Sequence, residues 1–280
     1  MPKQNRAGGN RDDFYAHPWL YAVEPFRVFG SLWFVGNSDG ASYVVDTGDG
    51  LALFDTNFAT ASALYMHDLW LGGFDPRRVK LIFHTHGHHD HFGSTALLQA
   101  LCGAKTVLGA EDAKMFRERP ELALVKHAHA PLELFTPDIE VKDGDVLRLG
   151  SMTVRCAATP GHTPGATTYF ITVNDGKKEL TAALHGGAGL NTLEKRFIEE
   201  YGCADMRPAF LASIDKLMPE KADIFLGNHT FQNHTLEKLE RRAAAPAGPD
   251  PFVDPGELQR FLAELRASYG AMLEREAAEG

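Results

Sequence analysis

Short hydrophobic runs separated by glycine-rich turns dominate the first part of the chain and predict β-strands. Such runs lie at 26–35, 42–45 and 51–54. The segments between them, Gly-Asn-Ser-Asp-Gly and Thr-Gly-Asp-Gly, are typical of turns. A loosely helical pattern follows at about 60–71, and 79–83 has the pattern of a buried strand. We therefore expect a group of strands that is followed by helices.

The second half of the chain repeats this order. Asp-Gly, Gly-Ser and Pro-Gly turns separate its strand candidates, which are 139–141, 146–149, 152–156, 167–173 and 180–184. A helical stretch over about 206–218 leads into a short apolar strand at 222–226. Two β-rich halves, each followed by helices, predict an α/β fold with sheets inside and helices outside.

The clearest helix prediction lies near the C-terminus, over 255–275. Asp254 can cap this helix, Pro255 suits its first turn, and hydrophobic residues then repeat at the spacing of one helix face. We expect that face to dock on the body of the protein rather than to bind a partner. Residues 1–22 are rich in Gly, Asn and charge, which predicts a flexible arm before a single domain at 23–280.

Composition narrows the class of protein. The formal net charge of −9 is spread along the chain, which disfavours nucleic-acid binding because that needs clustered Lys and Arg. No run of about 18 apolar residues occurs, so we expect no membrane span. The polar N-terminus lacks the pattern of a signal peptide, which predicts a cytoplasmic location, with a periplasmic or secreted protein as the alternative if a leader was removed. Three dispersed cysteines give no disulfide framework and no thiolate zinc site.

A dense histidine cluster carries the candidate chemistry. His-Thr-His-Gly-His-His-Asp-His occupies 84–91, directly after the predicted strand at 79–83. Alternating histidines on an extended loop can point two imidazoles toward one ion, while Asp90 and His91 can face a neighbouring ion. Zinc favours imidazole and carboxylate ligands, and a catalytic zinc keeps a position open for water. The cluster therefore predicts a metal site.

This cluster resembles the metal motif of the metallo-β-lactamase superfamily. Two further motifs of that family are similar and follow in order: Thr-Pro-Gly-His-Thr-Pro-Gly at 159–165 and Leu-Gly-Asn-His at 226–229. The strands at 42–45 and 51–54 also resemble the early strands of the family. The resemblance implies a four-layer αββα sandwich.

The resemblance also implies two Zn²⁺ ions and assigns their ligands. One ion would be held by His86, His88 and His162, and the other by Asp90, His91 and His229. In this family a hydroxide that bridges the metals opens an amide, lactone or ester bond, and Asp90 would be the catalytic residue that orients it. Asp55 would have a supporting role at most.

Differences between this chain and the motifs of individual branches of the superfamily indicate which branch it resembles most. His88 stands where the diiron flavoproteins of the superfamily carry glutamate, which favours zinc and hydrolysis. The segment 180–189 lacks the bridging aspartate of glyoxalases, lactonases and RNA-processing members, so the chain most resembles the third subclass of metallo-β-lactamases. It has His185-Gly-Gly-Ala-Gly where that subclass places serines for the substrate. A lactonase or thioesterase without β-lactam activity, a non-catalytic metal-binding protein, and a mono-zinc or iron enzyme remain alternatives.

Three residues are candidates for contact with a small-molecule substrate: His89, His185 and Asn233. For His185 we favour a partly buried histidine with a backbone partner over a ligand or substrate contact, because lone histidines are commonly structural. His84 and His89 are interpreted as residues that support or border the pocket. His127 and His129 are expected to face solvent, with a lid over the pocket as the alternative. The sequence does not indicate the oligomeric state.

Overall fold

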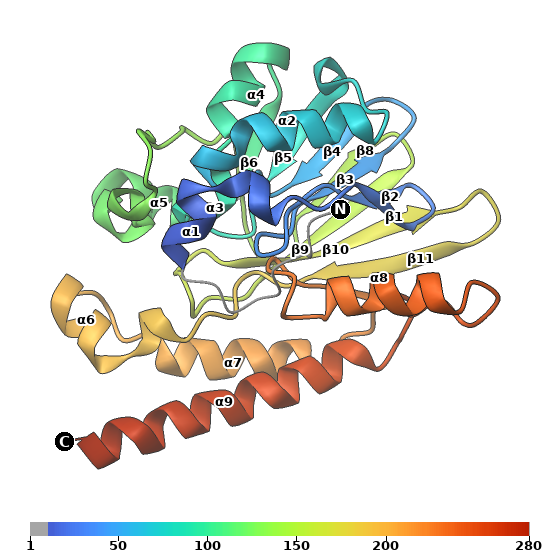
Figure 1. The fold of residues 1–280 in the computed structure, drawn as a ribbon. Coiled ribbons are helices and arrows are strands. Elements are labelled where there is room, and N and C mark those ends of the chain that lie inside the picture. Colours follow the sequence, from blue (N-terminus) through green and yellow to red (C-terminus); the bar gives the residue numbers. More distant parts are fainter. Residues whose placement is uncertain (1–10, 280) are drawn as a thin grey trace.

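The computed structural model describes residues 11–279, and in them two β-sheets lie face to face (Figure 1). The first sheet has the order β1-β2-β3-β4-β5-β6-β7 and the second the order β12-β11-β10-β9-β8. The strands of the first sheet are β1 (Phe26–Phe29), β2 (Leu32–Phe34), β3 (Tyr43–Asp46), β4 (Leu51–Phe54), β5 (Val79–Phe83), β6 (Lys105–Gly109) and β7 (Ile139–Val141). Those of the second are β8 (Val146–Leu149), β9 (Met152–Ala158), β10 (Thr167–Asn174), β11 (Glu179–Leu184) and β12 (Ile224–Leu226).

Helices cover the outer face of each sheet. The helices are α1 (Arg11–Ala16), α2 (Ser62–Leu71), α3 (His89–Phe92), α4 (Thr95–Cys102), α5 (Ala110–Glu118), α6 (Lys195–Tyr201), α7 (Arg207–Leu217), α8 (Thr235–Ala244) and α9 (Glu257–Glu279). In Figure 1, α2 and α4 lie over the first sheet, while α7 and α9 lie over the second. This arrangement is the predicted αββα sandwich, so the fold prediction is confirmed.

The hydrophobic runs form strands because their alternate residues are buried on opposite faces. In β4, Ala52 and Phe54 join the core between the two sheets, whereas Leu51 and Leu53 pack against α2 and α4. A second outer core joins α7 and α9 to the face of the second sheet. A strand that is buried on both faces reads as a continuous apolar run, which is why these segments were visible in the sequence.

The N-terminal segment differs from its prediction. Residues 11–16 form α1, and Phe14, Tyr15 and Tyr21 are buried against Phe58 and Ala61. The prediction of a flexible arm over 1–22 is therefore wrong from residue 11 onward, because three aromatic side chains anchor this part of the segment. Residues 1–10 lie outside the described residues.

The C-terminal helix was predicted at 255–275 and is observed as α9, from Glu257 to Glu279. Its buried side chains include Leu258, Leu262 and Leu265, which pack in the same core as α7. The expected docking face is thus the one that the structure buries.

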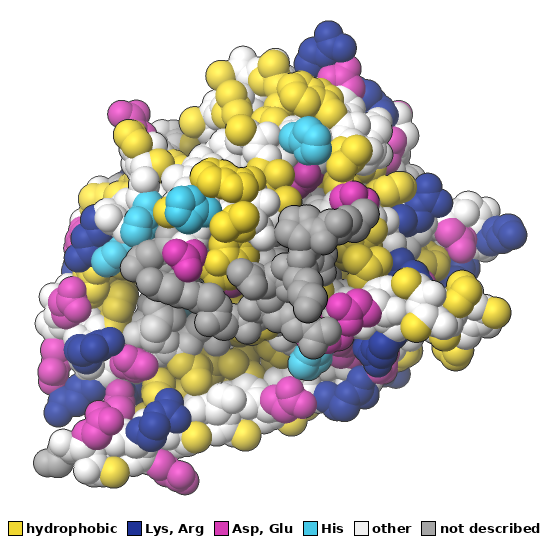
Figure 2. Space-filling view, in the orientation of Figure 1, with side chains coloured by type: hydrophobic (Ala, Val, Ile, Leu, Met, Phe, Trp, Pro, Cys, Tyr) yellow, Lys and Arg dark blue, Asp and Glu magenta, His cyan; other side chains and the backbone are white. Residues whose placement is uncertain are grey.

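Two surface properties bear on the expected partners. On the face shown in Figure 2, acidic and basic side chains of the described residues are interspersed rather than gathered by sign. No helix within residues 11–279 has both the length and the apolar character that crossing a bilayer requires.

Candidate metal centre

The candidate metal ligands meet where strands of both sheets end. His86 and His88 lie in the loop after β5, and Asp90 and His91 lie in the short helix α3. His162 lies in the loop between β9 and β10, and His229 follows β12. Parallel pairing of β4, β5 and β6 in one sheet, and of β11 and β12 in the other, brings the carboxyl ends of strands to this edge, where open α/β sheets place their sites.

The first ligand cluster consists of His86, His88 and His162. One nitrogen from each ring lies within 4.8 Å of the others. Nδ1 of His88 is 3.0 Å from Nε2 of His162. Burial lowers the pKa of His162 to about 4 and holds the pKa values of His86 and His88 well below the ordinary value, so the three imidazoles are neutral.

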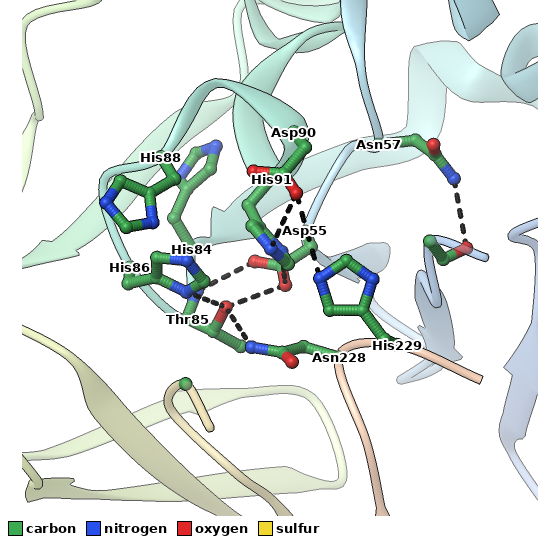
Figure 3. A network of polar contacts seen from close by, with 12 residues as sticks. Asp55, Asn57, His84, Thr85, His86, His88, Asp90, His91, Asn228 and His229 are labelled. Carbon is green, nitrogen blue, oxygen red and sulfur yellow. Dashed lines mark hydrogen bonds and ion pairs between the residues drawn. The ribbon is translucent and has the colours of Figure 1, made fainter. Parts of the chain in front are cut away.

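The second ligand cluster consists of Asp90, His91 and His229, again with one ligand atom each within 4.8 Å of the others. Oδ2 of Asp90 lies 3.7 Å from Nε2 of both histidines (Figure 3). Burial opposes ionisation of Asp90, but the surrounding histidines outweigh it and keep the pKa of Asp90 well below its usual range. The carboxylate is therefore ionised and can accept hydrogen bonds or bind a cation.

These donor atoms fit a metal ion that prefers nitrogen and oxygen ligands. Nε2 of His86 is buried without a hydrogen-bond partner among the described residues, although Nδ1 of the same ring contacts the Thr85 hydroxyl at 3.1 Å. Nδ1 of His162 contacts the Gly189 carbonyl at 2.8 Å, so this nitrogen donates, and the lone pair of Nε2 faces Nδ1 of His88. A buried nitrogen without a partner, such as Nε2 of His86, is costly, and a metal ion would satisfy it.

Asp55 supports the second cluster more extensively than the sequence indicated. Its carboxylate accepts hydrogen bonds from the backbone N–H of Thr85 at 2.7 Å, from the Thr85 hydroxyl at 2.8 Å and from Nδ1 of His91 at 2.8 Å (Figure 3). Asp55 lies directly after β4 with a φ of 55°, a conformation that Asp tolerates better than most residues. It orients a predicted ligand and fixes the loop that carries the others.

Asp112, at the start of α5, is a supporting residue that the sequence analysis missed. It accepts hydrogen bonds from the backbone of Gly87 at 2.7 Å and of Gly165 at 2.6 Å, and from the Thr163 hydroxyl at 2.7 Å. Burial raises its pKa to about 6 against the effect of these donors. Asp112 thereby ties the loop of His86 and His88 to the loop of His162. An acidic residue in the first turn of a helix was visible, but such residues commonly serve only the helix dipole.

The polar side-chain atoms of His185 and Asn233 form hydrogen bonds within the protein. His185 is buried, its Nδ1 accepts a hydrogen bond from the backbone of Gly187 at 3.1 Å, and its ring meets Phe261. Asn233 was expected to border the pocket, and the structure contradicts this: its amide donates to the Phe225 carbonyl at 3.0 Å and accepts from Thr235 at 2.6 Å. These bonds hold the start of α8 against β12, so the Asn233 side chain has a structural role.

The remaining histidines have different surroundings. His84 contacts the Val107 carbonyl and the Thr95 hydroxyl, which holds β5 to β6 and α4. His89 is buried close to Tyr15 and lines the cavity over the two ligand clusters. His127 and His129 are both exposed, as expected, and the ring of His129 also stacks on Tyr15.

A cavity of about 360 Å³ opens over both ligand clusters. The loop after β11, the loop after β12 and one face of α9 build its walls around the predicted ligands. Its apolar lining residues are Leu124, Ala188, Leu190, Phe231, Phe261 and Leu265. Space of this size beside the clusters is sufficient for a small organic molecule.

Comparison with known families agrees with this geometry. The model of the metallo-beta-lactamase superfamily matches residues 35–176, just over half of the chain. The chain belongs to this superfamily. The matched residues include the first four predicted ligands and His162, while His229 lies beyond them.

Among curated relatives of this superfamily, a probable metallo-hydrolase of Burkholderia pseudomallei is 31% identical over 124 residues, which are 42% of this chain and 38% of that protein. A hydroxyacylglutathione hydrolase of Anaeromyxobacter dehalogenans is 29% identical over 128 residues, 46% of this chain and 40% of that protein. The chain therefore spans about two fifths of the length of these relatives.

Among solved structures, BJP-1, a subclass B3 metallo-β-lactamase of Bradyrhizobium japonicum, matches with a TM-score of 0.82 and 27% identity. That match covers 94% of this chain and 98% of BJP-1. The whole fold thus has the architecture of a subclass B3 metallo-β-lactamase, in agreement with the superfamily match.

Proposed function

We propose that the protein is a binuclear zinc hydrolase that opens an amide, lactone or ester bond in a small-molecule substrate. The observation that supports this most directly is the pair of clusters, one of three neutral imidazoles and one containing an ionised carboxylate, beneath a common cavity. Imidazole and carboxylate donors without thiolates suit zinc. When bound, two zinc ions would acidify a water molecule and polarise the carbonyl oxygen of the substrate.

The residues around the metal centre would have separate roles in binding the metals, orienting the water and positioning the ligands. His86, His88 and His162 would hold one ion, and Asp90, His91 and His229 the other. Because Asp90 has a lowered pKa, it stays ionised and can accept a hydrogen bond from the attacking water, which fixes the direction of the water's lone pair. Asp55 and Asp112 would position these residues without touching the substrate.

Two substrate classes are supported by relatives. The solved structure BJP-1 is a metallo-β-lactamase, which makes a β-lactam the first substrate to test. A relative named as a hydroxyacylglutathione hydrolase supports a thioester. A non-catalytic metal-binding protein and an enzyme loaded with one zinc or with iron are the alternatives.

The test is hydrolysis of a chromogenic cephalosporin and of a panel of lactones and thioesters by the natively expressed protein, with its metal content measured by elemental analysis. We expect turnover of at least one class and its loss on chelation and in Asp90→Ala. Asp49→Asn, in an exposed turn, is the matched control and should retain activity. Two bound zinc ions with no turnover across the panel would favour the non-catalytic alternative, and iron or a single zinc would overturn the binuclear assignment.

A further inference from the structure

A second cavity, of about 240 Å³, borders the first ligand cluster on the side of α5 and α6. His88 and His162 line both this cavity and the one over the metal centre. Because these two imidazoles are in contact, at 3.0 Å between Nδ1 and Nε2, together they form a common boundary. We call this space the α5/α6 cavity.

The walls of the two cavities are also continuous along the chain. Leu122 lines the α5/α6 cavity, and Leu124, two residues later, lines the cavity over the metals. On the opposite side, Thr192 faces the α5/α6 cavity and Asn191 the metal cavity. The two cavities are therefore neighbours, and the imidazole pair is part of the wall of each.

The α5/α6 cavity has an apolar interior. Its main lining side chains are Met115, Leu122, Phe197 and Met206. Methionine side chains are unbranched and polarisable and adapt to flexible ligands. These residues come from α5, from the turn after it, from α6 and from the start of α7, so they close around the space from several directions.

The polar groups at the α5/α6 cavity are engaged elsewhere or lie at its rim. The hydroxyl of Thr163 donates to Asp112, and that of Thr192 donates to the His162 carbonyl at 2.8 Å. Arg119 donates to the Tyr201 carbonyl at 2.6 Å and pairs with Glu121, which joins the end of α5 to the end of α6. Lys114 is exposed at the rim between two glutamates. The interior thus offers apolar contact rather than recognition of a charge.

We propose that the α5/α6 cavity receives a linear hydrocarbon arm of the substrate, so that the enzyme acts on esters, thioesters or lactones with a medium-length acyl chain. This inference rests on the proposed hydrolase function, and it names the part of the substrate that lies away from the scissile bond. The carbonyl would lie over the ligand clusters, and the chain would pass His88 and His162 into the apolar space. Burial of each methylene group then strengthens binding.

The first experiment measures hydrolysis of 4-nitrophenyl esters from acetate to decanoate by the zinc-loaded full chain. We expect kcat/KM to rise roughly three- to fourfold per added methylene, mainly through KM, until the cavity is filled. Ala204 lines the cavity from an exposed loop, so Ala204→Trp should fill it without disturbing the core. This variant should lose the dependence on chain length, because the added ring would occupy the space that the longer chains reach. Met206→Ala should extend the dependence to longer chains.

The second experiment measures binding of 1-alkanols, from butanol to decanol, by calorimetry on the same protein. We expect Kd to fall by a similar factor per methylene, Ala204→Trp to abolish the trend, and the alkanols to inhibit ester hydrolysis competitively. Ala271→Trp, on the exposed face of α9, is the matched control and should change neither measurement.

The outcomes separate the two proposals. Ester hydrolysis that is independent of chain length, or an alkanol series unaffected by Ala204→Trp, overturns the acyl-chain inference and leaves the hydrolase function standing. Non-competitive inhibition by decanol overturns it as well, because the cavity would then hold a separate ligand. Length-dependent alkanol binding that Ala204→Trp abolishes, with no ester, lactone, thioester or β-lactam turned over, supports the assignment of the cavity and contradicts the proposed hydrolase.

Discussion

The carboxylate of Asp55, directly after β4, and Nδ1 of His91, in α3, lie 2.8 Å apart, and both residues are buried. In this contact the ring N–H donates to the carboxylate, which leaves Nε2 of His91 free for a metal ion. Carboxylates in this position commonly fix the tautomer of a metal-binding histidine and raise its basicity. Burial lowers the pKa of His91, but the charges of Asp90 and Asp55 outweigh it and raise the pKa above its ordinary value.

We expect Asp55→Asn to lower the metal affinity of the second cluster by about 10- to 100-fold. Asparagine tolerates the positive φ of this position, but its amide nitrogen cannot accept from His91 or Thr85. Titration with zinc against a chelating dye should show one weakened site and one retained site. Asp49→Asn is the control, and equal affinities in the two variants would contradict the role of Asp55.

Asp112→Asn should destabilise the protein and loosen both ligand loops. The carboxylate accepts from three donors, and an amide leaves at least one of them without an acceptor, which costs about 1–3 kcal/mol when the group is buried. Urea denaturation should detect this loss, and zinc titration should show weaker binding at the first cluster. Glu111→Gln, at the neighbouring exposed position, should leave both unchanged. Unaltered stability in Asp112→Asn would show that the three contacts are dispensable.

Local patterns in the sequence predicted an α/β fold and a metal site, whereas the four-layer arrangement and the full ligand set were implied by the resemblance to the metallo-β-lactamase superfamily. Apolar runs predicted β4 and β5 at their observed positions. Every residue of β4 is buried, and in β5 only Lys80 is exposed, so neither strand shows a regular polar alternation. The spacing of His86, His88 and Asp90 predicted the cluster, because these residues share one loop and one short helix. The structure then brought His162 and His229 to that loop from elsewhere in the chain.

The supporting contacts could not be predicted, because they join residues that are remote in sequence. Asp112 is 51 residues from Thr163, and nothing in the local pattern of either residue indicates the other. Asn233 was misjudged for the same reason: its position close to His229 suggested a pocket residue, whereas its partner Phe225 is on the preceding strand. The polar composition of the N-terminal segment led to the prediction of a flexible arm. A few buried aromatic rings are nevertheless enough to anchor residues 11–22.

The structure explains why glycines occupy positions in the segment 186–189, which the sequence alone did not show. A Cβ atom on Gly189 would lie 2.6 Å from Cε1 of His162, and one on Gly187 would lie 2.9 Å from Cδ2 of the same ring. The backbone therefore packs directly against a predicted ligand, where a serine side chain would not fit without displacing it.

We expect Gly189→Ala to push His162 away from the first cluster and lower its zinc affinity by about tenfold or more. Zinc titration monitors the affinity, and circular dichroism monitors the fold. Gly270→Ala is the control, since a Cβ atom there meets nothing within 4 Å. Should Gly189→Ala bind zinc as tightly as the parent, the ring has room to adjust and the packing explanation fails.

Asp68, on the inner side of α2, makes stability depend on pH. Burial raises its pKa to about 7 against the opposing contact with His67, whereas the unperturbed value is 3.8. Between these two values the folded protein keeps a proton that the unfolded chain releases. The contribution of Asp68 to the free energy of unfolding therefore falls as pH rises through this window.

Asp68→Asn cannot ionise, so the variant should be more stable than the parent at pH 8 and about equally stable at pH 4. We expect a gain on the order of 1 kcal/mol at pH 8, or about 2–4 °C in Tm. Calorimetric melting of both proteins at several pH values, with zinc saturating, measures the difference while the pH dependence of metal binding cancels. Asp49→Asn should show no such gain. A constant difference between Asp68→Asn and the parent across the pH range would mean that Asp68 is not the titrating group.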